Sequence, residues 1–557
     1  QQVGIYENKP FESYFSGNTV QICPVGALTG AAYRFRARPF DLVSTPSACE
    51  HCASGCDMRT DVRRGKTLRR LAGDDATVNE EWNCDKGRWA FKYVTSVDRL
   101  TTPLVRNSAG ELVAASWPEA LAAAAKGLKA SKAAVLVGGR ATYEDAYGYS
   151  KFARIALGTN DIDFRSRLSS NEEREFLAAR VVGSTTTYVD IDRADHVLLV
   201  GFEPEEESPI VFLRLNKQVR KRALKVTAIA TKLSIGVEKL KGEFVKVAPG
   251  AEAAAIASQS LTSKSVILVG ERAAESAGVL SAVAALADST SAKIAWIPRR
   301  AGERGALEAG AIGNLLPGGR PVTDAAARVD IGALWGTDSL PSAEGKSAQE
   351  IYAAVNAGEI GALLVGGVDP LDGDNSQGAL AALDKAFVVS LEIASSAVTQ
   401  RADVVLPVAA ITEKSGSFLN WEGRPRAFDT AVQDSLNRSD LRILSMIAEE
   451  MGATVNLATV TSAVKEIASL GKWDGARVSM SKVSASAQPA VSGDQFILTS
   501  WRRLLDLGTL QQGEENLAGT ARATVAVISP KRAGALGVVD GDKLKISTSL
   551  GSVTLNA

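Results

Sequence analysis

The hydrophobic pattern between about residues 102 and 476 alternates short apolar runs that end in glycine with longer stretches of helical periodicity. The four runs are Val135–Gly138, Leu198–Gly201, Ile267–Gly270 and Leu363–Gly366. Each is typical of a buried parallel strand with a glycine at its carboxyl end. Helices are predicted between the runs at Tyr143–Ala156, Pro209–Leu224 and Ala274–Leu286. This alternation predicts a doubly wound α/β fold, in which ligands bind beyond the carboxyl ends of the strands.

The two ends of the chain follow other patterns. Apolar positions in residues 62–71 flank a turn at Gly65 and predict a short hairpin. Arg34, Arg36 and Arg38 alternate before Pro39, which favours extended backbone, and they either place positive charge near a partner or form a solvated strand face. Residues 477–494 are rich in Ser, Ala and Val and indicate a linker. Residues 495–557 are rich in strand formers and predict a small terminal β-barrel.

Length and charge narrow the class of protein. At about 150 residues per domain, 557 residues suggest three or four domains. A net charge of zero gives no indication of wholesale binding to nucleic acid or to an anionic membrane. We find no signal peptide and no uninterrupted apolar run of about 18 residues, so membrane association is expected only through partner subunits. With only His51 and His196, chemistry that needs several histidines is excluded.

Four of the five cysteines form the pattern C-x2-C-x3-C-x27-C, at Cys49, Cys52, Cys56 and Cys84. Three thiolates within eight residues and a fourth from a distant loop suit a cubane 4Fe–4S cluster. Zinc is the alternative, since four thiolates also suit a tetrahedral ion, although structural zinc sites usually pair two short knuckles. Disulfides are the weakest interpretation in a long chain without secretory features. Reduced ligands indicate the cytoplasmic side.

The fifth cysteine, Cys23, precedes Pro24. A Cys-Pro pair commonly marks the last ligand of a ferredoxin-type cluster whose other ligands come earlier in the chain. No other cysteine precedes Cys23, so it is either a plain buried thiol or a ligand whose partners lie before residue 1. The chain begins with Gln1 rather than Met and is expected to be a fragment, which favours the second interpretation.

These motifs together resemble a known family. The cysteine pattern followed by Asp85-Lys86-Gly87-Arg88 resembles the iron–sulfur module of molybdopterin oxidoreductases. Further segments resemble the pterin domain of that family: Gly361–Pro370, Ala402–Pro407, Glu413, Gly416, Asn420 and Glu422–Arg424. Residues 530–551 look like its terminal barrel. The opening segments Ile22–Thr29 and Phe35–Phe40 are similar to the large iron–sulfur subunits of bacterial NADH:quinone oxidoreductase, respiratory complex I.

This resemblance implies a subunit that passes electrons from NADH and flavin through iron–sulfur clusters toward quinone, with no catalytic acid, base or nucleophile of its own. It implies that Cys23 is the last ligand of a 4Fe–4S cluster on the electron path, with a 2Fe–2S and a further 4Fe–4S cluster in a missing amino-terminal segment. The Cys49, Cys52, Cys56 and Cys84 cluster matches an extra, off-path cluster of some bacterial members. Implied partners are the NADH/FMN-binding subunit and the ferredoxin-like quinone-side subunit, in a peripheral arm on the cytoplasmic side of the bacterial plasma membrane.

The sequence departs from the pterin enzymes at Arg167-Leu168-Ser169-Ser170, where many of them carry a cysteine or selenocysteine metal ligand. Ser169 alone does not exclude molybdenum. A formate-type site, however, needs a Cys-His pair, and no cysteine follows Cys84. We therefore expect no molybdopterin. The catalytic alternative is the large subunit of a molybdenum-dependent, NAD-linked formate dehydrogenase, and a structural alternative is a zinc scaffold.

Two further residues of the cysteine segment, Lys86 and His51, each allow two interpretations. Lys86 either tunes the nearby cluster electrostatically or is a surface lysine with a solvated ammonium. His51, between two ligands, is a less favoured cluster ligand, because four cysteines are available.

The predicted architecture is a multidomain α/β molybdopterin-oxidoreductase-like fold with an iron–sulfur module, doubly wound parallel sheets and a C-terminal β-barrel. The expected domains are the tail of an N-terminal ferredoxin-like iron–sulfur domain (1–40), a 4Fe–4S module (41–101), an α/β region of two or more subdomains (102–476), a linker (477–494) and the barrel (495–557).

Overall fold

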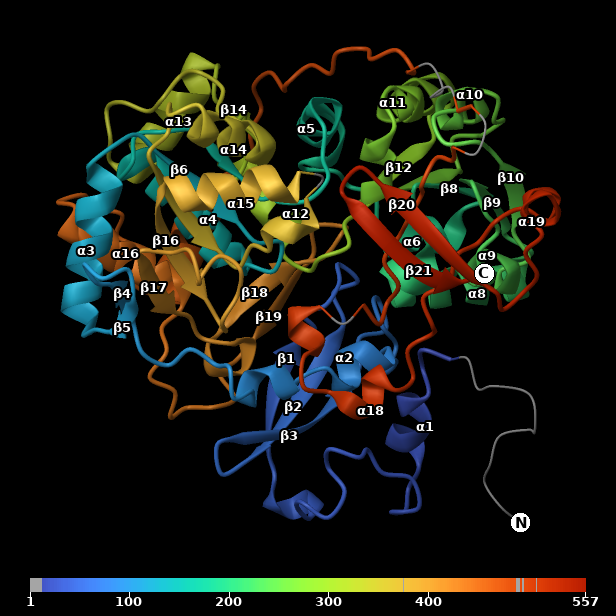
Figure 1. Cartoon of the computed structure of the whole chain (residues 1–557), viewed down its shortest axis with the longest axis horizontal. Helices are drawn as coiled ribbons and strands as arrows, with labels where there is room; N and C mark the ends of the chain where they lie inside the picture. The colour runs from blue at the N-terminus through green and yellow to red at the C-terminus, as the bar shows by residue number, and fades with distance from the viewer. Residues whose placement is uncertain (1–12, 374, 487–490, 493–494, 507) are drawn as a thin grey trace.

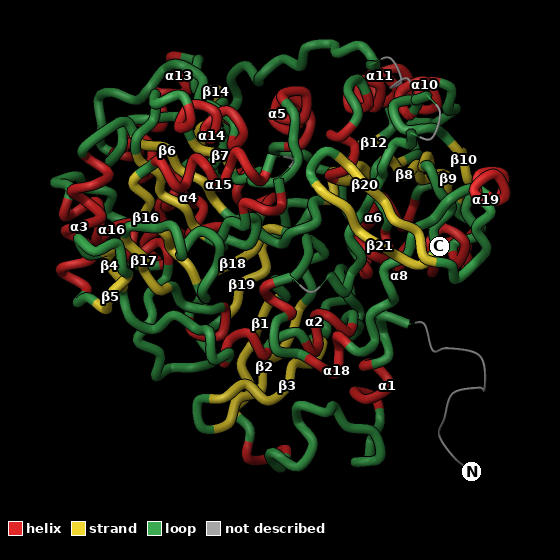
Figure 2. The backbone as a smooth tube through the Cα atoms, in the orientation of Figure 1, coloured by secondary structure: helices red, strands yellow, loops and turns green. Residues whose placement is uncertain are grey.

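Two sheets of mainly parallel strands form most of the structure. The computed structural model describes residues 13–373, 375–486, 491–492, 495–506 and 508–557. In Figure 1 a seven-stranded sheet lies on the left, a five-stranded sheet on the right, and a module that contains the clustered cysteines lies below both. Helices surround the strands of both sheets (Figure 2). Among the described residues, no helix is both long enough and apolar enough to cross a membrane.

The seven-stranded sheet has a parallel centre and an antiparallel edge. Its strands, in spatial order, are β5 (Leu112–Ala114), β4 (Leu104–Arg106), β17 (Val404–Pro407), β16 (Phe387–Glu392), β15 (Ala362–Gly366), β6 (Ala133–Val137) and β7 (Ile162–Asp163). The pairs from β17 to β7 are parallel, whereas β4 pairs antiparallel with β17 and β5. Its accompanying helices are α3 (Trp117–Lys129), α4 (Tyr143–Ile155), α12 (Glu303–Glu308), α13 (Ala325–Trp335), α14 (Ala348–Asn356), α15 (Ser376–Lys385), α16 (Asp440–Glu450) and α17 (Val460–Ser469).

The five-stranded sheet is parallel throughout. Its strands, in spatial order, are β10 (Glu243–Lys246), β9 (Lys225–Ala230), β8 (His196–Val200), β11 (Val266–Gly270) and β12 (Lys293–Ile297). The chain proceeds from β8 to one side and then restarts on the other side at β11, which is the doubly wound arrangement. The helices of this region are α5 (Asn171–Phe176), α6 (Tyr188–Arg193), α7 (Pro204–Glu207), α8 (Pro209–Arg222), α9 (Ile235–Lys239), α10 (Glu252–Ala257) and α11 (Val279–Thr290).

The sequence-based predictions for the α/β region are confirmed. All four apolar runs form strands whose every residue is buried: β6, β8, β11 and β15. Two of the predicted helices match α4 and α8 closely. The third begins later than predicted, at Val279, because Glu271–Glu275 forms a 3₁₀ turn and Gly278 has a left-handed φ of 82° that starts α11 afresh.

The cysteine module is a three-stranded antiparallel sheet of β1 (Val43–Ala48), β2 (Asp57–Arg63) and β3 (Lys66–Ala72), together with α1 (Gly17–Ile22) and α2 (Asp85–Trp89). The predicted hairpin is confirmed as β2–β3. Its two-residue turn has φ values of 51° at Arg64 and 71° at Gly65, which is the type I′ geometry that glycine favours. Small 3₁₀ turns at Pro39–Asp41 and Lys92–Thr95 flank the module.

The expected C-terminal β-barrel is wrong for the described residues. They form a two-stranded ladder of β20 (Lys543–Thr548) and β21 (Gly551–Asn556), preceded by α18 (Glu515–Ala518) and α19 (Pro530–Leu536). The apolar run before Pro530 contributes only a single bridge, from Val525 to Asn556. Neither of the two strands buries a full face.

Two further pairs of short strands join loops. They are β13 (Leu315–Leu316) with β14 (Arg320–Pro321), and β18 (Gly416–Leu419) with β19 (Pro425–Phe428). The described part of the predicted linker, residues 477–486 and 491–492, contains no helix or strand.

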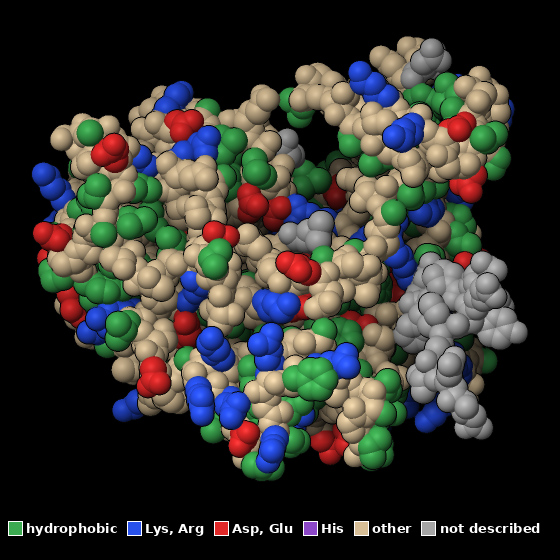
Figure 3. Space-filling view, turned by 60° about the horizontal axis from the view of Figure 1, so that its bottom comes forward, with side chains coloured by type: hydrophobic (Ala, Val, Ile, Leu, Met, Phe, Trp, Pro, Cys, Tyr) green, Lys and Arg blue, Asp and Glu red, His purple; other side chains and the backbone are tan. Residues whose placement is uncertain are grey.

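The arginine-rich segment is extended only next to Pro39, where Arg38 has φ −90° and ψ 153°. Residues 31–36 are a series of turns, and Phe35 takes a left-handed φ of 61°. The side chains of Arg34, Arg36 and Arg38 are exposed. Figure 3 shows several Lys and Arg side chains on the face of the molecule that brings the cysteine module forward.

Candidate metal centre

The turn between β1 and β2 carries three of the four clustered cysteines. Cys49 directly follows β1, Cys56 directly precedes β2, and the N–H of Cys49 donates to the carbonyl of Cys56 over 3.4 Å. The fourth, Cys84, caps the amino end of α2. All four side chains are buried, between 4% and 7% exposed. The antiparallel pairing of β1 with β2 therefore closes the triple, and α2 brings the distant fourth thiol to it.

Distant parts of the chain hold this turn in place. Three successive carbonyls of the turn each accept a hydrogen bond: Ala53 from Trp421 N (3.0 Å), Ser54 from Tyr188 Oη (2.9 Å) and Gly55 from Arg426 Nε (3.1 Å). The rings of Tyr188 and Trp421 also meet edge to face, with centroids 4.9 Å apart. Gly55 has a left-handed φ of 77°, and a Cβ there would lie 2.5 Å from Asn420 Cβ.

Gly87 leaves space between two of the thiols. A Cβ at Gly87 would lie 3.1 Å from Cys49 Sγ and 3.7 Å from Cys84 Sγ, and the Gly87 N–H donates to Cys84 Sγ over 3.4 Å. The N–H of a residue without a side chain thus approaches the sulfurs closely. Such N–H···S bonds are one of the means by which a protein tunes an iron–sulfur cluster.

The electrostatic environment of the four cysteines favours binding of a positively charged metal centre. Burial raises the pKa of Cys49 and of Cys56 well above the usual range, and negative charge on the neighbouring cysteines adds to the shift. Burial likewise raises the pKa of Cys84 to about 12, with Cys52 contributing in the same direction. Four thiolates packed together in a dry site repel one another, and the positive charge of coordinated metal offsets that repulsion, so that bound thiols are deprotonated. The donor set therefore fits an iron–sulfur cluster.

The two residues between Cys49 and Cys52 belong to a buried network beside the thiols. Glu50 accepts hydrogen bonds from Arg70 Nη1 (2.9 Å) and Tyr93 Oη (2.9 Å). Burial raises the pKa of Glu50, but the Arg70 guanidinium beside it outweighs burial, so the net pKa is lowered. His51 Nε2 is 2.9 Å from the carbonyl of Ala90, and burial lowers the pKa of His51 to about 4. Burial therefore keeps the His51 ring neutral, and the Ala90 carbonyl holds its position.

The Asp85–Arg88 motif ties the module together. Asp85 accepts hydrogen bonds from the backbone N–H groups of Ser16 (3.0 Å) and Gly17 (2.7 Å), at the start of α1. Arg88, 2% exposed, donates to Gln21 Oε1 and Asn18 Oδ1 on the same helix. These contacts fix α1, and with it Cys23, relative to the four-cysteine site.

Lys86 is not the surface lysine that one interpretation predicted. It is 4% exposed, and its Nζ donates to Asp506 Oδ1 (2.7 Å) and to the carbonyl of Leu504 (2.8 Å). Burial lowers the pKa of Lys86, and Asp506 opposes that shift. The partner comes from the far end of the chain, 420 residues away, and no local sequence signal marks it.

The environment of Cys23 differs from that of the four buried cysteines. It directly follows α1 and is partly exposed, and its Sγ is 3.1 Å from the carbonyl of Val25. Hydrogen bonding with the backbone of Val25 and Leu28 lowers the pKa of Cys23. Cys23 is thus a partly exposed thiol with backbone hydrogen-bond partners, rather than a plain buried one.

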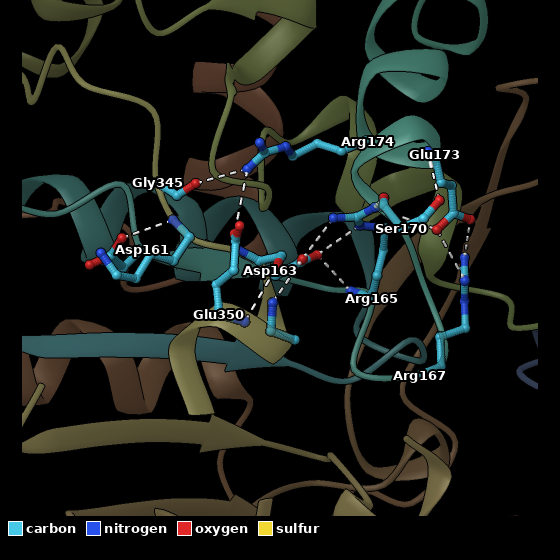
Figure 4. A network of polar contacts seen from close by, with 12 residues as sticks. Asp161, Asp163, Arg165, Arg167, Ser170, Glu173, Arg174, Gly345 and Glu350 are labelled. Atoms are coloured by element: carbon cyan, nitrogen blue, oxygen red, sulfur yellow. Dashed lines mark hydrogen bonds and ion pairs between the residues drawn. The ribbon is translucent and has the colours of Figure 1, made fainter. Parts of the chain in front are cut away.

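The Arg167–Ser170 stretch lies in a dense ion-pair network (Figure 4). Arg167 Nη2 is 2.8 Å from Glu173 Oε1, and Arg167 Nε is 3.2 Å from Glu303. Arg165 pairs with Asp163 at 2.9 Å. Ser169 is 8% exposed and Ser170 caps α5. The charged side chains beside Ser169 are thus neutralised by partners from the chain itself.

Sequence reasoning missed the residues that hold the site. Tyr188, Trp421 and Arg426 support the cysteine turn, and Asp506 pairs with Lys86, yet none of them lies in the cysteine segment. The only partial signal was the resemblance of Asn420 and Glu422–Arg424, which flank Trp421, to a family motif. Among the described residues, no group of three or more His, Cys, Asp or Glu side chains is arranged to hold a single metal ion.

Three family models match consecutive parts of the chain. The models are molybdopterin oxidoreductase over residues 99–450, the molybdopterin oxidoreductase Fe4S4 domain over residues 42–96, and the ferredoxin-like domain of NADH-quinone oxidoreductase subunit 3 over residues 1–29. The first alone covers more than half of the chain.

Individual proteins match over the whole chain. The G subunit of NADH-quinone oxidoreductase from Mycobacterium tuberculosis is 56% identical over 574 residues, which cover 100% of this chain and 71% of that protein. The corresponding protein of Streptomyces coelicolor is 52% identical over 595 residues, with the same shares. Among solved structures, acetylene hydratase from Pelobacter acetylenicus shares the fold, with a TM-score of 0.58, 14% identity and coverage of 92% of this chain and 90% of that chain.

Proposed function

The chain belongs to the family of NADH-quinone oxidoreductase G subunits, within the molybdopterin oxidoreductases, and from this we propose that it is an electron-transfer subunit of complex I. Electrons from NADH and flavin pass through its iron–sulfur clusters toward quinone. The observation that carries the proposal is the buried four-thiol site in a chain that is 56% identical, over its whole length, to a member of this family. No side chain of this site is required as acid, base or nucleophile.

Cys49, Cys52, Cys56 and Cys84 are the ligands of one 4Fe–4S cluster in this proposal. The support is the match of residues 42–96 to an Fe4S4 domain, the burial of all four thiols and the space that Gly87 leaves between Cys49 and Cys84. When bound, the cluster supplies one-electron redox chemistry. The chain fixes the position of the four thiolates, excludes water from them and directs the Gly87 N–H at Cys84.

Cys23 is the last ligand of a second 4Fe–4S cluster, on the electron path. Its remaining ligands, together with a 2Fe–2S and a further 4Fe–4S cluster, belong to sequence before residue 1. The match of residues 1–29 to a ferredoxin-like domain supports this assignment, as do the partial exposure and lowered pKa of the thiol.

The proposed domain organisation of the chain follows from these sites. Residues 1–40 are the tail of the ferredoxin-like domain, residues 41–101 the 4Fe–4S module and residues 102–476 the α/β region. A linker (477–494) and a terminal segment (495–557) complete it. The ladder β20–β21 belongs to the terminal segment.

We propose that the α/β region holds no molybdopterin. Serine stands at the position of the metal ligand, and the cations around it are already paired. Arg167 bonds Glu173 and Glu303, and Arg300 contacts Glu271 at 3.2 Å. An anionic pterin cofactor bound by these arginines would have to displace their carboxylates. The same pairing disfavours a catalytic formate dehydrogenase.

The partners are the other subunits of complex I. In this proposal the nearest are the NADH/FMN-binding subunit and the ferredoxin-like quinone-side subunit, and the chain lies in the peripheral arm on the cytoplasmic side of the membrane. Association with the membrane runs through those subunits.

Metal analysis of the purified intact complex tests the function directly. Iron, molybdenum, tungsten and zinc are quantified beside low-temperature EPR of the reduced complex. Iron with 4Fe–4S signals and neither molybdenum nor tungsten is the expected result. Stoichiometric molybdenum or tungsten would instead make this a pterin enzyme, and stoichiometric zinc without 4Fe–4S signals would make the four-cysteine site a scaffold.

A further inference from the structure

A short segment near the carboxyl end of the chain is fastened against the four-cysteine site. This segment, residues 501–506, is called the strap here. Leu504 N–H donates to Glu206 Oε2 (2.8 Å), and the Leu504 carbonyl accepts from Lys86 Nζ (2.8 Å). Leu504 and Leu505 are 4% and 7% exposed and share one hydrophobic cluster with Cys84. The strap therefore belongs to the wall of the cysteine site, and the red C-terminal chain crosses beside α2 in Figure 1.

Asp506, at the end of the strap, is surrounded by cations. Its Oδ1 is 2.7 Å from Lys86 Nζ, and its Oδ2 is 2.9 Å from Arg299 Nη2. Arg140 also faces Asp506, and the Nε of Arg140 has no hydrogen-bond partner within the described residues. Lys86 and Arg299 are 4% and 8% exposed, so water screens these charges weakly. Asp506 is the carboxylate that compensates the positive charge at this point.

The charge of Lys86 reaches the cysteine site through α2. Lys86 is two residues beyond Cys84, and its field is among the influences on that thiol. When a 4Fe–4S cluster is reduced, it gains one electron and no bond forms or breaks. A nearby positive charge stabilises the reduced form, and a nearby negative charge stabilises the oxidised form. The net charge around a cluster is one of the factors that set its reduction potential.

We propose that Asp506 is a positioning residue that holds Lys86 and compensates its charge, and thereby keeps the reduction potential of the Cys49/Cys52/Cys56/Cys84 cluster low. This inference rests on the proposed 4Fe–4S cluster at that site. It gives the C-terminal strap a role in electron distribution. With Asp506 in place, a smaller fraction of the cluster is reduced at a given potential than without its negative charge.

The test is a redox titration of the assembled complex, with dithionite as reductant and the EPR signal of this cluster as readout. Asp506→Asn keeps the shape of the side chain and removes its charge. At the potential where half of the wild-type cluster is reduced, the variant should show an about tenfold higher ratio of reduced to oxidised cluster, equivalent to 59 mV for one electron. Lys86→Gln should move the ratio in the opposite direction, and the double variant should return close to wild type.

Arg502→Gln is the matched control. It removes the ion pair between the strap and Asp372 without touching Lys86, so the potential should stay at the wild-type value. A shift equal to that of Asp506→Asn would mean that only the seating of the strap matters, and would overturn the proposal.

The Lys86→Gln variant provides a second comparison if Asp506→Asn alone loses the cluster. Adding Asp506→Asn to Lys86→Gln must still raise the reduction potential of the cluster, because it removes a negative charge. Unchanged potentials in both backgrounds overturn the inference. A wild-type complex without any 4Fe–4S signal from this site overturns the proposed function instead, so the two failures are distinguishable.

Discussion

Gly87→Ala tests whether the space between the thiols is used by a cluster. The added Cβ would lie 3.1 Å from Cys49 Sγ and 3.7 Å from Cys84 Sγ. Gly87 is inside α2 and has no left-handed φ, so the backbone accepts alanine without strain. The effect is therefore confined to the space that the methyl group fills, which faces the sulfurs.

The magnitude follows from two opposing effects. Overpacking a tight buried site costs about 1–3 kcal/mol. Alanine in a helix is more favourable than glycine by roughly 1 kcal/mol. The net cost to the thiol geometry is then at most about 2 kcal/mol, which corresponds to an up to about 30-fold weaker retention of the cluster. The fold itself, with its large separate cores, should persist.

The assay compares iron per chain and the EPR signal of this cluster in purified wild-type and Gly87→Ala complexes. Gly534→Ala in α19 is the matched control, because a Cβ there meets no atom within 4 Å. We expect Gly87→Ala to lose iron and signal during purification or dilution, and Gly534→Ala to match wild type. Full iron and an unchanged signal in Gly87→Ala would refute the assignment of this space to the cluster.

Three further predictions concern the other sites. Cys84→Ser should perturb the EPR signal of the extra cluster and leave most NADH:quinone turnover of the assembled complex intact, because the family places that cluster off the path; complete loss of turnover with normal assembly contradicts this. Cys23→Ser should abolish most turnover, since it breaks a cluster on the path, and unchanged turnover would disprove the assignment. Burial raises the pKa of Glu392 from 4.5 to about 7, with Asp440 and Asp369 adding to it. A carboxyl with a raised folded pKa contributes stability below pH 4.5 that is lost as the pH rises to about 7, at most roughly 3 kcal/mol. Glu392→Gln should therefore reduce the fall in melting temperature between pH 5 and 8, and an unchanged fall would exclude this residue as its source.

Local sequence patterns were sufficient to predict the strands of the α/β region and the four candidate cysteine ligands. The runs that became β6, β8, β11 and β15 are apolar at every position, which is the pattern of a strand with both faces buried. The turn at Gly65 followed from the need for left-handed backbone. The spacing of the four cysteines was sufficient to predict a candidate cluster site, because the short spacings bring three thiols to one turn.

Predictions failed where a distant contact decides the outcome. The described residues do not form the terminal barrel, because strand-forming composition does not say whether a third strand will pair. The sequence did not decide whether Lys86 is exposed or buried, because a lysine side chain can extend its charged end to water. In the folded chain the ion pair with Asp506 compensates the cost of burying Lys86.

The amino-acid sequence by itself thus determined the family, the α/β architecture and the four thiols, all of which depend on residue type and short-range spacing. Only the tertiary structure decided what surrounds those thiols. Tyr188, Trp421 and Arg426 converge on three carbonyls of the cysteine turn, and Asp506 pairs with Lys86, from positions more than a hundred residues away. The physical reason is that such contacts form when sheets and helices pack, and their partners carry no pattern that distinguishes them along the chain.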